Sequence, residues 1–239
     1  MTNAITSFAR KALIAAALIG TVAMTGCSST ASSTSNTTLG TEIAAPRDEI
    51  KDVDAIRPVD VINRSKDHVT RSGEVYLMRG LANIFSRGID DMADKMRARG
   101  FDAANFSYKY WKPIAQDIVA RAKNDTVSYP VIIMGHSLGG NESSKFANYL
   151  AANGVKVELV VTFDPVETGR VGGNIGEVVN YYLPMQKTDN RIHAAAGFEG
   201  ELKNIDVTTD KSITHTNVEK NAAFQSASIK KAIAITSAL

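Results

Sequence analysis

The sequence predicts an α/β fold in which a mostly parallel central sheet carries helices on both faces. Short and almost uniformly apolar segments, such as Val131–Met134 (VIIM) and Val157–Phe163 (VELVVTF), indicate strands that are buried on both sides. Amphipathic segments with helical spacing, such as Gly88–Gly100, separate these runs. This alternation is typical of parallel sheets, whose carboxyl ends collect the functional side chains.

The elements of the first half become regular from residue 74 onward. Glu74–Arg79 (EVYLMR) is rich in β-forming residues and predicts a strand. Gly88–Gly100 predicts a helix, because its apolar residues share one face, its start is acidic and its end is basic. Ala104–Tyr110 predicts a second strand, and Pro113 opens a second helix. The segment 46–73 is charged and weakly patterned, so it admits either a strand or a short helix.

The second half continues the same alternation. After the strand at Val131–Met134, the pattern predicts a helix that runs to about Ala152 and stops at Asn153-Gly154. The connection from Pro165 to Glu177 is short and glycine-rich, which leaves no room for a large cap domain. A closing helix is expected from about Asn217. Further strands are expected at Val157–Phe163, Val178–Leu183 and Leu202–Val207.

The N-terminal region is not expected to form part of this domain. A basic pair precedes an apolar run from Ala12 to Met24, which is the layout of a secretory signal peptide and is short for a membrane span of roughly 20 residues. Met24–Cys27 resembles a bacterial lipobox, and this resemblance implies a lipid anchor on Cys27 at the periplasmic side of a membrane. The alternative is an ordinary signal cleaved after Thr25, which would leave a soluble periplasmic or secreted protein.

The expected organisation is a signal peptide (1–26), lipidated Cys27 with a Ser/Thr-rich tether (27–45) and one α/β domain (46–239). The chain has 27 basic and 25 acidic side chains, and the signal contains two of the bases, so 25 of each remain. This balance gives no electrostatic footprint for nucleic acid. Cys27 is the single cysteine, so no intramolecular disulfide is expected.

One motif carries a prediction of chemistry. Gly135–Gly140 (GHSLGG) lies between an apolar strand and a helix and matches G-x-S-x-G, the nucleophile elbow. Such a tight turn strains Ser137 and requires small residues two positions before and two after it. It presents the Ser137 hydroxyl at the top of the sheet and directs the backbone N–H of Leu138 toward the oxyanion of a tetrahedral intermediate. Ser137 is therefore the predicted nucleophile.

With this motif in this context, residues 74–239 resemble the α/β-hydrolase superfamily, which includes lipases, esterases and thioesterases. The resemblance implies a minimal α/β-hydrolase fold with little or no cap. It also implies catalytic residues in the chain order Ser…Asp/Glu…His. Neither a metal nor an organic cofactor is implied.

His215 is the predicted general base. It follows a predicted strand and precedes Thr216–Glu219, an S/T-x-x-E capping box that we expect to begin the last helix. Superfamily members place their histidine in this loop, and the positive end of a helix would keep the imidazole neutral. His193 is the alternative base. His136, inside the elbow, is expected to point away from the nucleophile, and His68 precedes the regular part of the fold.

Asp164 is the predicted acid of the triad, since it ends the strand VELVVTF and would orient the base. Its position is one strand earlier than many superfamily members use, although thioesterase-like members also place the acid there. Asp189 after the strand VVNYYLP is the competitor, and Asp206 is a weaker one. A turn formed by Asp164 and Pro165 is the structural alternative.

The second oxyanion donor is expected after the first strand, as the backbone N–H of Leu81. Many superfamily members carry His-Gly where this chain has Arg79-Gly80, which leaves the donor open. Two further groups near the catalytic edge either line an acyl-binding site or pack in the core. They are Tyr108, Tyr110 and Trp111, and Asn83, Ile84 and Phe85.

These residues together predict a serine hydrolase of the carboxylesterase, lipase or thioesterase type. Ser137, His215 and Asp164 would cleave an ester or thioester through an acyl-enzyme. The substrate would be a small-molecule or lipid acyl compound, reached at a membrane surface through the anchor on Cys27. The alternatives are a catalytically inactive binding lipoprotein on the same fold and a structural envelope anchor.

Overall fold

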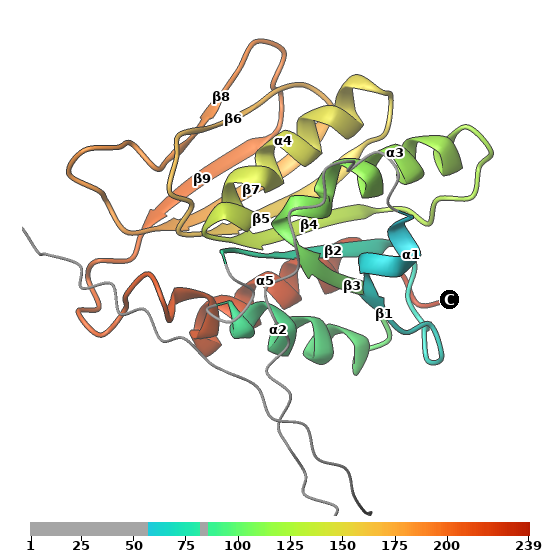
Figure 1. The fold of residues 1–239 in the computed structure, drawn as a ribbon, viewed down its shortest axis with the longest axis horizontal. Coiled ribbons are helices and arrows are strands. Elements are labelled where there is room, and N and C mark those ends of the chain that lie inside the picture. Colours follow the sequence, from blue (N-terminus) through green and yellow to red (C-terminus); the bar gives the residue numbers. More distant parts are fainter. Residues whose placement is uncertain (1–56, 82–85) are drawn as a thin grey trace, which may run out of the picture. The chain divides into compact units, whose positions relative to one another are not determined.

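The computed structural model describes residues 57–81 and 86–239 (Figure 1). The predicted signal peptide and the tether with Cys27 lie outside the described residues, and so do residues 83–85. Within the described part of the chain, every helix is too short or too polar to cross a bilayer.

The central sheet has seven strands in the spatial order β1-β3-β2-β4-β5-β7-β9. Every neighbouring pair is parallel except the first, in which β1 runs antiparallel to β3. The prediction of a mostly parallel central sheet is confirmed. The strands are β1 (Asn63–Arg64), β2 (Glu74–Arg79), β3 (Asp102–Ser107), β4 (Val131–His136), β5 (Val157–Phe163), β7 (Ile175–Tyr182) and β9 (Glu201–Asp206).

Helices cover both faces of this sheet. In Figure 1, α3 and α4 lie on one side of the strands, and α2 and α5 lie on the other. The short helix α1 precedes β1, so the weakly patterned region before residue 74 holds both a helix and a strand. The helices are α1 (Pro58–Val61), α2 (Arg87–Arg97), α3 (Trp111–Ala122), α4 (Leu138–Ala152) and α5 (Ala222–Ile235).

The strands β2, β3, β4, β5 and β7 each contribute to two separate apolar cores, because successive residues of a strand point to opposite faces. In β2, Leu77 belongs to the same buried cluster as Ile89 of α2 and Ile229 of α5. The next residue, Met78, belongs to the cluster that contains Phe146 of α4. Burying one large apolar side chain stabilises the fold by about 1.5–3 kcal/mol. A shift of a strand by one residue would move its apolar side chains to the opposite face, so burial in the two cores keeps the strands in register.

The segment after β3 differs from the expectation of a strand over 104–110. The strand ends at Ser107, and Tyr108–Tyr110 form one turn of 3-10 helix. Helix α3 then begins at Trp111, so Pro113 is its third residue rather than its first. Proline is tolerated there because the first N–H groups of a helix have no partner inside it.

The strands β5, β7 and β9 are joined without helices, which departs from the expected alternation. Two short strands, β6 (Gly169–Val171) and β8 (Ile192–Ala194), pair in parallel in these connections. β6 packs on α4, where Asn148 donates to the Arg170 carbonyl (2.8 Å) and accepts from the N–H of Gly172 (2.9 Å). Strands of three residues are too short to produce a periodic pattern in the sequence.

The closing helix begins later than expected, and the predicted capping box at Thr216–Glu219 is wrong. Helix α5 starts at Ala222, and the side chain of Asn221 caps it by accepting two backbone N–H groups of its first turn (3.0 and 3.2 Å). The side chain of Glu219 is fully buried in a preceding turn of 3-10 helix.

Candidate active site

The turn between β4 and α4 has the geometry expected of a nucleophile elbow. Ser137 lies at φ 58° and ψ −123°, a conformation that residues with side chains rarely adopt. A Cβ added to Gly135 would lie 2.2 Å from the carbonyl oxygen of Gly139, and one added to Gly139 would lie 2.3 Å from that of Met78. Both positions therefore require glycine, as the spacing of the motif predicts.

The structure brings the three predicted side chains into one hydrogen-bonded line. The Oγ of Ser137 lies 3.0 Å from Nε2 of His215, and Nδ1 of His215 lies 2.7 Å from Oδ2 of Asp164. Asp164 is an acceptor on this side, so Nδ1 carries the proton and Nε2 accepts from the serine hydroxyl. The three residues come from the carboxyl ends of β4 and β5 and from the loop between β9 and α5.

Asp164 is held in place by groups that the sequence did not single out. It is 4% exposed and lies at φ 46°, and its Oδ1 accepts the Leu183 N–H and the Asn190 side-chain amide (both 2.9 Å). Asn190 is itself buried and donates also to the Leu183 carbonyl (3.0 Å). These donors leave Oδ2 of Asp164 directed at His215. Nothing in the local sequence around Asn190 marks it for this position.

The Asp164 carboxylate raises the pKa of His215, through its hydrogen bond to Nδ1 and through its charge, against the opposing effect of burial. The sequence predicted the opposite influence, in which the positive end of the last helix keeps the imidazole neutral. The pKa is instead shifted upward by Asp164, and α5 begins only at Ala222, seven residues after His215.

The alternative acid and base are found together, but apart from the nucleophile. Asp189 accepts from His193 Nε2 (2.8 Å) and from Arg191 Nε (2.8 Å) in an exposed cluster. These two partners lower the pKa of the Asp189 carboxyl. Asp206 accepts from the backbone N–H and the hydroxyl of Thr208 (2.8 and 2.6 Å). Each alternative residue is thus hydrogen-bonded to groups outside the line that contains Ser137. The spacing of these residues along the chain did not predict these partners.

His136 is buried, and its ring contacts two other loops. Its Nδ1 lies 2.8 Å from the hydroxyl of Ser86, and its Nε2 lies 2.7 Å from the backbone carbonyl of His215. Burial lowers the pKa of His136 to about 4, so the ring is neutral near pH 7. No pattern in the sequence predicted contact between His136 and the loop of His215.

The loop after β2 lies against the elbow. A Cβ added to Gly80 would be 2.9 Å from the Cβ of Ser137, so the backbone at this point approaches the nucleophile closely. Leu81 follows directly and its side chain is exposed. Leu138 is the first residue of α4, where a backbone N–H has no partner within the helix. The side chain of Arg79 pairs with Asp90 (3.1 Å).

Of the aromatic residues near this edge, Trp111 is partly buried and packs against the core. Its ring packs against Phe146 and Tyr149, with centroid separations of 6.2 and 6.1 Å. Tyr110 is also partly buried against the same apolar cluster. The packing alternative therefore describes both residues. Asn83, Ile84 and Phe85 lie outside the described residues.

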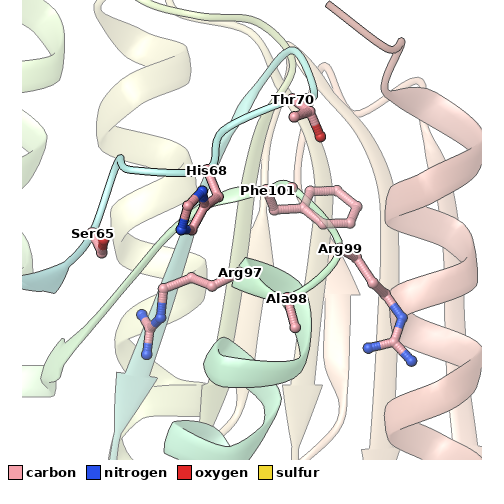
Figure 2. Close-up of a pocket in the computed structure, with 8 residues that line it drawn as sticks. Ser65, His68, Thr70, Arg97, Ala98, Arg99 and Phe101 are labelled. Carbon is pink, nitrogen blue, oxygen red and sulfur yellow. The ribbon is translucent and has the colours of Figure 1, made fainter.

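A pocket of about 610 Å³ lies at the opposite end of the sheet (Figure 2). Thr70 and Phe101 of its lining precede β2 and β3, whose amino ends face away from the edge that carries Ser137. The guanidinium of Arg97 is held there by the Ala103 carbonyl (2.8 Å). This pocket is thus separate from the candidate active site. The remaining lining residues are Ser65, His68, Ala98, Arg99 and Gly100.

No model of a protein family matches the chain, and no curated protein sequence matches it. Solved structures with a similar fold include the NocB thioesterase domain from the nocardicin cluster, with 10% identity, a TM-score of 0.43, and 73% of this chain and 99% of that chain covered. Est1E from Butyrivibrio proteoclasticus has 10% identity and a TM-score of 0.42 over 72% of this chain and 92% of that one. A putative hydrolase of the α/β superfamily from Xanthomonas campestris pv. campestris has 12% identity and a TM-score of 0.42 over 68% and 99%.

Proposed function

We propose that the protein is a serine hydrolase that cleaves an ester or thioester through an acyl-enzyme. One observation carries the proposal, namely the line of hydrogen bonds from Ser137 through His215 to Asp164. A nucleophile, a base in the right tautomer and a buried acid in this order can activate a serine hydroxyl. The strained elbow supports the same role, because it holds the hydroxyl at the edge of the sheet.

The reaction begins when Oγ of Ser137 attacks the carbonyl carbon and Nε2 of His215 accepts the hydroxyl proton. Asp164 holds the imidazole ring in place and stabilises the imidazolium that forms. The backbone N–H groups of Leu138 and Leu81 are proposed to stabilise the oxyanion. When the tetrahedral intermediate collapses, the alcohol or thiol leaves with the proton from His215. Water then attacks the acyl-enzyme by the same route and releases the acid.

The proposed substrates are small-molecule or lipid acyl compounds. Support comes from the short connection between β5 and β7, which contains no helix that would cover the nucleophile.

We also propose that the protein acts on the periplasmic side of a bacterial membrane, anchored by a lipid on Cys27. The support is the sequence Met24–Cys27 with its basic and apolar flanks. Metabolic labelling with an alkyne fatty acid tests this directly. Lipid should be incorporated into the wild-type chain and be absent from Cys27→Ser, and equal labelling of both would contradict the anchor.

The activity is tested with a fluorophosphonate probe on the full chain in mild detergent, beside Ser137→Ala, His215→Ala and His193→Ala. Labelling should be lost in the first variant and fall by about 10³-fold or more in the second, because the serine is then no longer activated. His193→Ala is the matched control, since this exposed histidine pairs with Asp189 outside the site. Folded wild-type protein that takes up no probe would overturn the proposal and favour an inactive binding protein.

A further inference from the structure

His136 lies beside the proposed nucleophile but takes no part in the proton transfer described above. His136 is only 1% exposed, so both ring nitrogens must find hydrogen-bond partners inside the protein. They do so in two different loops: Nδ1 meets the hydroxyl of Ser86 (2.8 Å), and Nε2 meets the carbonyl of His215 (2.7 Å). A neutral imidazole has one donor and one acceptor, and these two partners determine which nitrogen is which.

The direction of each hydrogen bond follows from the carbonyl of His215, which can only accept. Nε2 of His136 therefore carries the proton, and Nδ1 accepts from the Ser86 hydroxyl. The oxygen of Ser86 in turn accepts the backbone N–H of Gly80 (2.9 Å). One continuous chain of donors and acceptors thus runs from the Gly80 N–H to the His215 carbonyl, with every member satisfied.

Ser86 gives independent evidence that this chain is a specific arrangement. It occupies the N-cap position of α2, where a serine oxygen ordinarily accepts an N–H of the first helical turn. Here its side chain makes no capping bond and is directed at His136 and Gly80 instead. A stabilising cap is thus replaced by a contact with the loops of the candidate site.

An ion pair between His136 and Glu219 would be a different explanation of the buried ring, and the geometry disfavours it. The nearest oxygen of Glu219 lies 3.8 Å from Nε2, beyond hydrogen-bond distance. Burial lowers the pKa of His136 and raises that of Glu219, so both groups are shifted toward their neutral forms. The His215 carbonyl is therefore the partner of Nε2.

The three loops that meet at this ring are those that carry the proposed catalytic groups. Gly80 precedes Leu81, the proposed oxyanion donor, and His136 precedes the nucleophile in the elbow. The third loop contains His215, the proposed base, whose backbone carbonyl accepts from His136 and whose side chain is half-exposed. No strand or helix includes His215, so its backbone position depends on contacts of this kind.

We propose that His136 is a positioning residue, which places the His215 base relative to Ser137 by donating from Nε2 to the His215 carbonyl and is itself oriented by Ser86. This inference rests on the proposed hydrolase function and extends it to a residue outside the triad. A small displacement of the base would lower the rate of proton transfer, because a misplacement of about 1 Å can cost about 10²-fold in rate.

Two substitutions test this role, because their side-chain amides extend to different distances from the backbone. In His136→Gln the amide nitrogen extends to the position of Nε2 and can still donate to the His215 carbonyl. In His136→Asn the amide extends only to the position of Nδ1, so it can contact Ser86 but not His215. Ser86→Ala, which removes the orienting hydroxyl, gives a second test should the larger changes impair folding. His193→Asn is the control for the loss of an unrelated histidine.

The measurements are kcat and KM for a short-chain chromogenic ester, per active site titrated with the fluorophosphonate, together with thermal unfolding. Titration corrects for any unfolded fraction, so a purely structural role would leave kcat per site unchanged. We expect His136→Asn to lower kcat per site by about 10-fold or more, with KM changed by less than about twofold. His136→Gln should recover most of the rate, and Ser86→Ala should fall between the two.

Equal kcat per site in His136→Asn and wild type would overturn the positioning role while leaving the hydrolase function intact. Equal loss in the Asn and Gln variants would also overturn it, since the donor at the Nε2 position would then be irrelevant. Failure of the hydrolase proposal has a different signature, because wild-type protein itself would show no labelling that depends on Ser137. That result would overturn both proposals.

Discussion

Nδ1 of His215 lies 2.7 Å from Oδ2 of Asp164, although the two residues are 51 positions apart in the chain. The parallel sheet creates this contact, since Asp164 ends β5 and the loop of His215 follows β9 at the same edge. The other oxygen of the carboxylate accepts two N–H groups, so the acid cannot rotate away from the ring. A base oriented in this way needs little reorganisation when it accepts a proton.

Asp164→Asn should lower kcat by about 10⁴-fold, the scale seen when the acid of a triad becomes an amide. The amide can donate to Nδ1 and so favours the wrong tautomer, in which Nε2 carries the proton. Asp189→Asn is the matched control, because Asp189 pairs with Arg191 and His193 outside the site. Steady-state ester hydrolysis measures both. A larger loss in Asp189→Asn would identify that residue as the acid instead.

The activity should require neutral His215 and therefore fall at low pH. The hydrogen bond to Asp164 raises the pKa of His215, so the midpoint of the acid limb of kcat/KM should lie at higher pH than the pKa of an ordinary histidine. In Asp164→Asn the charge that stabilises imidazolium is gone, and the midpoint should move to lower pH. A proton NMR titration of the His215 ring checks the shift without turnover. An unchanged midpoint in the variant would mean that another group titrates.

The strands of the central sheet could be predicted because their signals are local. Glu74–Arg79 and Val157–Phe163 are strands over the whole expected range, since a strand buried on both faces is mostly apolar and rich in β-forming residues. The closing helix was misplaced because Thr216 and Glu219 have the spacing of a capping box, whereas burial of Glu219 and the cap at Asn221 decide the real start. Those facts depend on tertiary packing, which a local pattern does not contain.

The nucleophile could be predicted for a similar reason, because the elbow is a local turn with its own glycine requirements. The pairing of Asp164 with His215 needed the order of strands as well, and the superfamily resemblance supplied it. Asn190 could not be found at all, since its contact with Asp164 bridges two loops with no pattern of their own. His136 was recognised as buried and structural, but its bond to the His215 carbonyl is visible only in three dimensions.

Asn190→Ala should weaken the fold. The substitution removes an N–H donor from Oδ1 of Asp164 and from the Leu183 carbonyl, which leaves buried acceptors less well satisfied. The expected loss of unfolding free energy is about 1–3 kcal/mol, measured by urea denaturation. Asn124→Ala is the control, because its exposed amide donates only to a helix carbonyl. Similar stability losses in the two variants would contradict a special role for Asn190.

Gly135→Ala should be far more damaging than its small size suggests. The new methyl group would lie 2.2 Å from the carbonyl oxygen of Gly139 and 2.5 Å from the Ser143 hydroxyl, so the elbow would have to open. We expect a loss above about 4 kcal/mol in urea denaturation, or failure to fold. Gly154→Ala separates collision from backbone strain, because Gly154 lies at φ +80° with nothing within 4 Å of an added Cβ.

Strain alone at Gly154 should cost about 1–2 kcal/mol, the penalty for a left-handed conformation with a side chain. The difference between the two variants therefore measures the collision inside the elbow. If Gly135→Ala were no less stable than Gly154→Ala, the turn would relax easily, and the close approach of Gly135 to Gly139 would not be what holds Ser137 at φ 58°. A large difference, by contrast, means that the strained serine is maintained by packing that only glycine permits.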